Sequence, residues 1–141
     1  MPDKVKRKAK RKTIKIRRKI KLAVDMDSQV ILSDTSNERE LKKYAKLKSV
    51  GNFTGRQDAE DKEVYSKCNE QDYHILTGNT KDFMGMPKKA SDSGVIGHAC
   101  PITKNVFANL KKLIRTKDHD HFHGKIYWIG EKAIKIKKDL S

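Results

Sequence analysis

The chain has 141 residues, the length of one domain, and can bury a single hydrophobic core. No apolar run approaches the roughly 20 residues of a membrane span, and the charged amino terminus lacks the apolar segment of a secretory signal. We therefore expect a cytoplasmic protein without a membrane partner, in which Cys68 and Cys100 are free thiols.

The net charge of +15 is concentrated at the amino terminus. Residues 1–24 hold twelve Lys/Arg against one Asp, a charge of +11, whereas the remainder of the chain carries +4. Basic blocks bind polyanions by releasing condensed counterions. The candidate nucleic-acid-binding residues are Lys8, Arg11, Lys12, Arg17 and Arg18. The alternative is a tail that only keeps the protein soluble.

The domain boundary follows this charge block. We expect residues 1–24 to form a basic tail and residues 25–141 to form the folded domain. Apolar side chains alternate between Ile14 and Val24, so part of the tail is expected to be disordered and part to form an edge strand.

The first half of the domain is predicted to contain a strand, a helix and a second short strand. The run QVILS at residues 29–33 has the pattern of a buried strand and ends at Asp34. A helix is expected at about residues 37–48, followed by a strand at residues 51–55 between two glycines.

A second strand–loop unit lies at residues 61–83. Asp61 begins a helix in which Val64 and Cys68 share one face, and the apolar residues 73–76 form a strand. Turn residues then lead to Asp82. Asp58 and Glu60 are alternatives to Asp61, and an acid at a helix start is commonly only a cap.

The second half of the domain continues the alternation of strands and helices. We expect a strand at residues 95–99, a helix that begins after Thr103, and a hairpin over residues 125–137. This order predicts an α/β fold, a three-layer domain with a mainly parallel central sheet and a C-terminal hairpin.

Three carboxylates are predicted to meet at one edge of this sheet. Asp34 and Asp82 each follow a strand, and Asp61 begins a helix between them. Clustered acids repel one another unless a cation neutralises them. Oxygen ligands suit Mg²⁺ or Mn²⁺, so these three residues are the predicted metal-binding and catalytic set.

The two strand–acid motifs resemble those of PIN-domain nucleases. The segment V-I-L-S-D-T-S ends in the family's D-T-S form, and T-G-N-T-K-D-F matches its T-x-N-x-x-D-F form. The step of 21 residues from Asp61 to Asp82 is also similar. The step of 27 residues from Asp34 to Asp61 is shorter than in typical members, so the chain resembles minimal, PIN-like toxin-type ribonucleases.

This resemblance implies a metal-dependent endoribonuclease, the toxin of a toxin–antitoxin pair. The implied partners are RNA, a protein antitoxin and a second copy of the chain. Side chains beside the acids could bind the scissile phosphate or only form turns: Thr35, Ser36, Thr77 and Asn79. The alternatives are a catalytically silent PIN-like module that binds nucleic acid and a basic accessory protein bound to RNA.

One further cluster lies at residues 118–123, with the sequence D-H-D-H-F-H. Alternating His119, His121 and His123 could bind zinc from one side of an extended segment. No distant His or Cys stands at ligand spacing, so we expect a solvated polar turn here. His98, on a predicted strand, is expected to be a hydrogen-bonded core residue.

Overall fold

A computed structural model describes residues 18–55 and 60–141. Its centre is a six-stranded sheet in the order β2-β1-β3-β4-β5-β6, in which only the last pair is antiparallel. The strands are β1 (Ile20–Val24), β2 (Ala45–Ser49), β3 (His74–Thr77), β4 (Val95–His98), β5 (Lys125–Ile129) and β6 (Ile134–Asp139). The predicted α/β class, mainly parallel sheet and terminal hairpin are confirmed.

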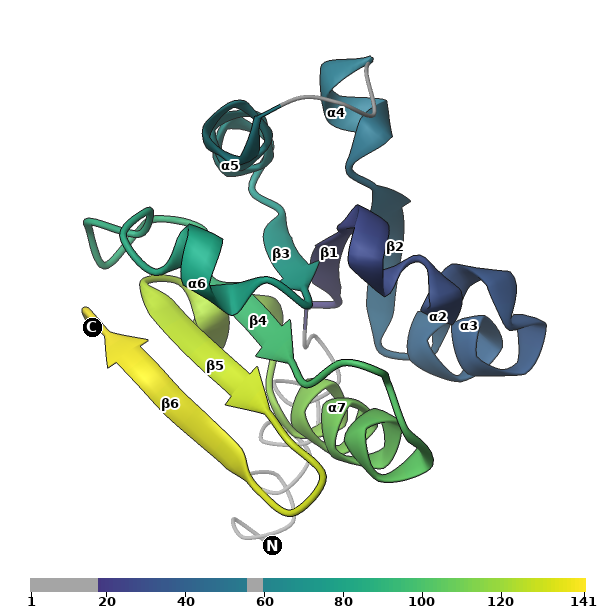
Figure 1. Cartoon of the computed structure of the whole chain (residues 1–141). Coiled ribbons are helices and arrows are strands. Elements are labelled where there is room, and N and C mark those ends of the chain that lie inside the picture. The colour runs from purple at the N-terminus through teal and green to yellow at the C-terminus, as the bar shows by residue number, and fades with distance from the viewer. Residues whose placement is uncertain (1–17, 56–59) are drawn as a thin grey trace, which may run out of the picture.

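Helices cover both faces of the sheet and make three layers (Figure 1). The helices are η1 (Met26–Ser28), α2 (Val30–Ser33), α3 (Thr35–Lys42), α4 (Gly51–Thr54), α5 (Asp61–Glu70), α6 (Thr80–Phe83), α7 (Lys104–Thr116) and η2 (His119–Phe122). Buried residues of α4, α5 and α6 pack against one face, and those of α2, α3 and α7 pack against the other. Among the described residues, no helix has the length and apolar character that a membrane crossing requires.

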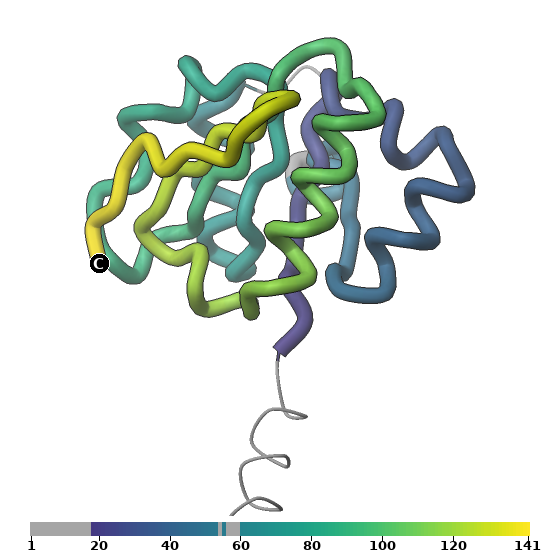
Figure 2. The backbone as a smooth tube through the Cα atoms, turned by 90° about the horizontal axis from the view of Figure 1, so that it is seen from below, coloured from purple at the N-terminus to yellow at the C-terminus, as the bar shows by residue number. Residues whose placement is uncertain are grey.

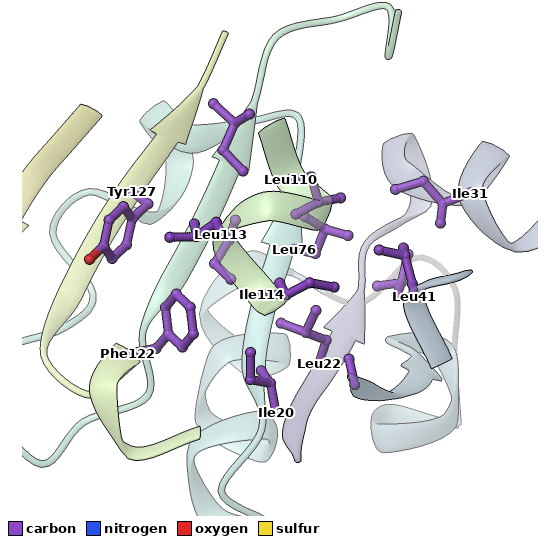
Figure 3. Packing of buried hydrophobic residues seen from close by; sticks show 14 of the residues in the cluster. Ile20, Leu22, Ile31, Leu41, Leu76, Leu110, Leu113, Ile114, Phe122 and Tyr127 are labelled. Carbon is purple, nitrogen blue, oxygen red and sulfur yellow. The ribbon is translucent and has the colours of Figure 1, made fainter. Parts of the chain in front are cut away.

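The larger core lies between the sheet and α7, which covers the strands in the perpendicular view (Figure 2). The predicted apolar stripe of α7 packs there, with Leu110 and Ile114 each 1% exposed, against Leu22 and Leu76 of the sheet (Figure 3). The side chain of Thr103 accepts a hydrogen bond from the Val106 N–H and so caps the helix, as predicted.

Strand β1 lies inside the sheet, which corrects the expectation of a tail or edge strand. Leu22 is in register with Leu47 of β2 on one side and with His74 of β3 on the other. Leu22 and Val24 are fully buried, because helices cover both faces of a parallel sheet. Residues 14–17 of the expected strand lie outside the described residues.

Three segments in the first half of the domain have a different secondary structure from the one predicted. The run QVILS forms helix α2, with Val30 57% exposed and Ile31 buried. Residues 45–49 form strand β2 instead of continuing a helix, and residues 51–54 form helix α4 instead of a strand. A short apolar run buries equally well as one helical turn or as a strand, so its periodicity does not distinguish the two.

Candidate functional site

Asp34 does not lie at the sheet edge, which corrects the predicted site. It is exposed and caps α3, where its carboxylate accepts a hydrogen bond of 3.1 Å from the Asn37 N–H. Thr35 and Ser36 are exposed at the start of the same helix. These three residues therefore lie apart from the acids that the sheet brings together.

Asp25 takes the place predicted for Asp34, because it directly follows the buried strand β1. Its backbone N–H donates to the Leu76 carbonyl, which extends the pairing of β1 with β3. Its carboxylate accepts 2.8 Å hydrogen bonds from the Met26 N–H and from the Thr77 hydroxyl. Thr77 in turn accepts from the Asn79 N–H. Thr77 and Asn79 thus lie beside an acid as predicted, and they orient it.

Asp27 is held at the same edge by the backbone after β3. Its carboxylate accepts a 3.0 Å hydrogen bond from the Gly78 N–H. A Cβ at Gly78 would lie 2.5 Å from the Cys100 sulfur and 3.0 Å from Asp27 Oδ2, so the close approach requires glycine.

Helix η1, which carries Asp27, is held in place by a buried hydrogen bond between Ser28 and His98. The Ser28 hydroxyl lies 2.6 Å from Nε2 of His98, and both side chains are almost fully buried. His98 is thus a bonded core residue, as predicted. The pair fixes the loop after β1 to strand β4.

Asp61 and Asp82 complete the group from two further elements. Asp61 is the first residue of α5, and Asp82 lies in α6, directly after β3. Burial raises the pKa of Asp61, and the charges of Asp25 and Asp82 and a hydrogen bond shared with Asp82 raise it further. The predicted pairing of Asp61 with Asp82 is therefore present in the structure.

The pKa of Asp25 is raised in the same way. Burial is the largest cause, and the charges of Asp27 and Asp82 add to it, against the lowering effect of the two hydrogen bonds. Four carboxylates from three separate segments thus act on one another at the carboxyl edge of a parallel sheet. In such sheets this edge is where ligands bind.

The donor set has the chemistry that a hard divalent cation prefers, but among the described residues no three of these acids lie close enough together to share one ion. All four acids offer oxygen ligands, and burial, together with the charges of the neighbouring acids, raises the pKa values of Asp25 and Asp61, an effect that a bound cation would oppose. No family model matches the sequence, and neither a curated protein nor a solved structure matches the chain.

Asp25 and Asp27 are the site residues that sequence reasoning missed. The signal was present: the buried pattern IKLAV is followed at once by D-M-D-S. The basic residues in front of it favour a tail, since five of the seven residues at positions 15–21 are Lys or Arg.

A second cluster lies at the opposite edge of the sheet, where the histidine-rich segment meets His74 of β3. Ring nitrogens of His74, His119 and His123 all lie within 4.8 Å of one another. Asp72 joins them, with its carboxylate oxygens 2.7 Å from His123 Nε2 and 3.1 Å from His119 Nε2. His121 points elsewhere and lies 2.6 Å from the Tyr127 hydroxyl. The segment is helical and its His119 is fully buried, so the prediction of a solvated turn is wrong for that residue.

Hydrogen bonds from the backbone argue against a zinc site in this cluster. The Lys21 N–H donates to Nδ1 of His119, and the Gly94 N–H donates to Nδ1 of His74. Both rings must therefore be neutral with the proton on Nε2, where a metal would need a lone pair. The His74 Nε2–H donates to the His119 carbonyl at 2.7 Å. The His119 Nε2–H faces Asp72 without the alignment of a good hydrogen bond.

Asp72 is the charged centre of this structural network. Burial alone would raise the pKa of its carboxyl, but the hydrogen bonds from His123 and Arg18 and the close approach of His119 hold it far below the usual range. Arg18, predicted to bind nucleic acid, forms ion pairs with Asp72 and Asp120 at 2.9 and 3.1 Å. The other predicted residues, Lys8, Arg11, Lys12 and Arg17, lie outside the described part of the chain.

Proposed function

We propose that the protein is a PIN-like, metal-dependent endoribonuclease whose site is Asp25, Asp27, Asp61 and Asp82. The observation that carries this proposal is the convergence of these acids on one edge of a parallel sheet, where burial and neighbouring carboxylates raise the pKa values of Asp25 and Asp61. The resemblance of the T-x-N-x-x-D-F segment supports the same assignment. A role as the toxin of a toxin–antitoxin pair stays a prediction.

The four acids would hold Mg²⁺ or Mn²⁺, which supplies an activated water and neutralises charge on the phosphate. The chain itself positions the acids: Thr77 orients Asp25, and the Gly78 N–H orients Asp27.

RNA is the proposed substrate for two reasons, the resemblance to PIN-domain ribonucleases and the positive net charge of the chain. A chain of net charge +15 attracts a polyanion over long distances, even though its reactive edge is acidic. Single-stranded segments are the most accessible form of RNA to a site at a sheet edge.

The test is cleavage of a single-stranded RNA with Mn²⁺ or Mg²⁺, with and without a chelator. Asp25→Asn and Asp61→Asn should each reduce the rate at least 100-fold, about the effect of losing one charged catalytic group. Their melting temperatures should stay equal or rise, because a carboxylate repulsion is removed. Asp34→Asn is the matched control, since asparagine caps a helix as well as aspartate and Asp34 lies outside the site.

Two results would contradict the proposal. The first is that Asp25→Asn and Asp61→Asn both cleave RNA at the wild-type rate. The second is that Asp34→Asn loses cleavage although its fold is intact. RNA binding without any cleavage, in either metal, would favour the silent nucleic-acid-binding module instead.

A further inference from the structure

A pocket of about 370 Å³ lies beside the acidic edge, on the face of the sheet that carries α6. Its lining residues come from two sources, the α6 segment and the hairpin β5–β6. They are Thr80, Lys81, Met84, Trp128, Lys135 and Lys137. The volume falls within the range of about 300–1,000 Å³ that holds small ligands.

The sheet register places this pocket next to the acids. Thr77, Gly97 and Trp128 are in register across β3, β4 and β5, so all three face the same side of the sheet. Trp128 therefore stands about 9–10 Å, two strand spacings, from the residue that orients Asp25. On the helix side, Lys81 of the pocket is adjacent in sequence to Asp82.

The chemistry of the pocket is that of an aromatic surface among cations. Trp128 is partly exposed, and the Lys135 Nζ lies 5.9 Å from the centre of its ring. Three of the six lining residues are lysines and none is acidic, although acids dominate the neighbouring edge. The neighbouring Lys138 is not part of this set, because its Nζ is bound to the Met84 and Pro87 carbonyls.

We propose that this pocket binds an unpaired nucleobase of the RNA strand, stacked on Trp128, with the adjoining phosphates held by Lys81, Lys135 and Lys137. The inference rests on the proposed function and adds a binding site beside the acids. Single-strand binding proteins combine these two elements, a stacking aromatic and a basic path for the backbone. An acidic peptide would satisfy the lysines but would leave the indole without a planar partner.

Trp128 is the only tryptophan of the chain, so its fluorescence reports the pocket directly. The wild-type protein, in chelator so that nothing is cleaved, is titrated with oligoadenylate. Saturable quenching is expected. An abasic strand with the same phosphates and poly-glutamate serve as probes of charge alone, and neither should quench.

The variants are measured by anisotropy of a labelled RNA. Trp128→Leu should weaken binding by about 5- to 100-fold, the effect of one lost base stack, whereas Trp128→Phe should keep most of the affinity. Tyr44→Leu is the matched control, because Tyr44 lines a smaller basic pocket of about 140 Å³. Replacing Lys135 and Lys137 together by glutamine should make the salt slope shallower by up to about two units.

The outcomes separate this inference from the nuclease proposal. If RNA is cleaved in the presence of metal but oligoadenylate does not quench Trp128, the base pocket is wrong and the nuclease proposal stands. The same conclusion follows if Trp128→Leu and Tyr44→Leu bind RNA with equal affinity. Quenching by oligoadenylate without cleavage in any metal supports the pocket and counts against the nuclease. Equal quenching by poly-glutamate overturns the base pocket in favour of a protein partner. If Trp128→Leu does not fold, the wild-type quenching decides.

Discussion

Acidification should destabilise this protein above the range in which its carboxylates titrate, because the buried His74 cannot take up a proton. Its Nδ1 accepts the Gly94 N–H and its Nε2–H is bound to the His119 carbonyl. Burial lowers the pKa of His74 to about 3, and the neighbouring His119 contributes to this effect. A folded-state pKa below the unfolded value of 6.5 means that the unfolded state binds the extra proton.

The magnitude follows from these two pKa values. Stability is fully present above pH 6.5 and is lost as the pH falls towards 3. Between pH 7.5 and pH 5.0, His74 alone should lower the free energy of unfolding by about 2 kcal/mol. Burial also lowers the pKa of His119, which adds a loss of the same sign. The low pKa of Asp72 acts only below about pH 4, where the unfolded carboxyl takes up its proton, so it does not contribute in this window.

Urea unfolding at the two pH values, followed by circular dichroism, measures the loss. His74→Gln is the comparison, because its amide does not titrate. This variant should start less stable at pH 7.5, yet lose about 2 kcal/mol less on acidification. Asp25 and Asp61 have raised pKa values and act in the opposite direction, but they are present in both proteins and cancel.

The result that refutes this reasoning is an equal loss of stability in wild type and His74→Gln. A nitrogen NMR spectrum provides a direct check of the same argument, since it distinguishes the two neutral forms of a histidine ring. A proton on Nδ1 of His74 at neutral pH would contradict the hydrogen-bond assignment.

Two further predictions concern packing and charge. Gly97→Ala should lower the free energy of unfolding by about 1–3 kcal/mol in urea, because its Cβ would overlap the Thr80 side chain; adding Thr80→Ala should recover part of the loss, and no recovery would point to another cause. Deleting residues 1–17 should weaken RNA binding and make its salt slope shallower while leaving the melting temperature unchanged; a lowered melting temperature would show that these residues stabilise the fold.

The second half of the fold could be predicted from the sequence because its signals are long and local. Helix α7 shows an apolar stripe over three turns and a threonine cap, and Thr77 is followed by turn residues that separate β3 from Asp82. In the first half, two short segments compete for the role of the first strand. Their periodicity is equally weak, and the flanking lysines favoured the wrong one.

The burial of β1 shows why those lysines misled the prediction. Lys21 lies within the strand, but its Nζ reaches the Gln71 carbonyl and lies 4.6 Å from the centre of the Tyr73 ring. A long aliphatic stem lets such a residue occupy a strand while its charge stays near the surface. Once β1 is placed, the parallel pairing brings Asp25 beside Thr77, and the site follows from the topology.

The histidine network could not be predicted, because its contacts join distant segments. His74 lies in strand β3, and His119 lies 45 residues later in the short helix η2. No local pattern signals which ring nitrogen accepts a backbone N–H, and that detail decides between a metal site and a structural one.

The two outer strands of the sheet have a consequence for aggregation. Among the described residues, β2 and β6 each have one edge that pairs with no other strand, and an open edge can template strand addition by another chain. Exposed lysines stand on both: Lys46 on β2 and Lys135 and Lys137 on β6. Two such edges repel each other when they approach. Neutralising these lysines, for example by acetylation, would remove this repulsion and leave β2 and the exposed Ile136 of β6 open to edge-to-edge association.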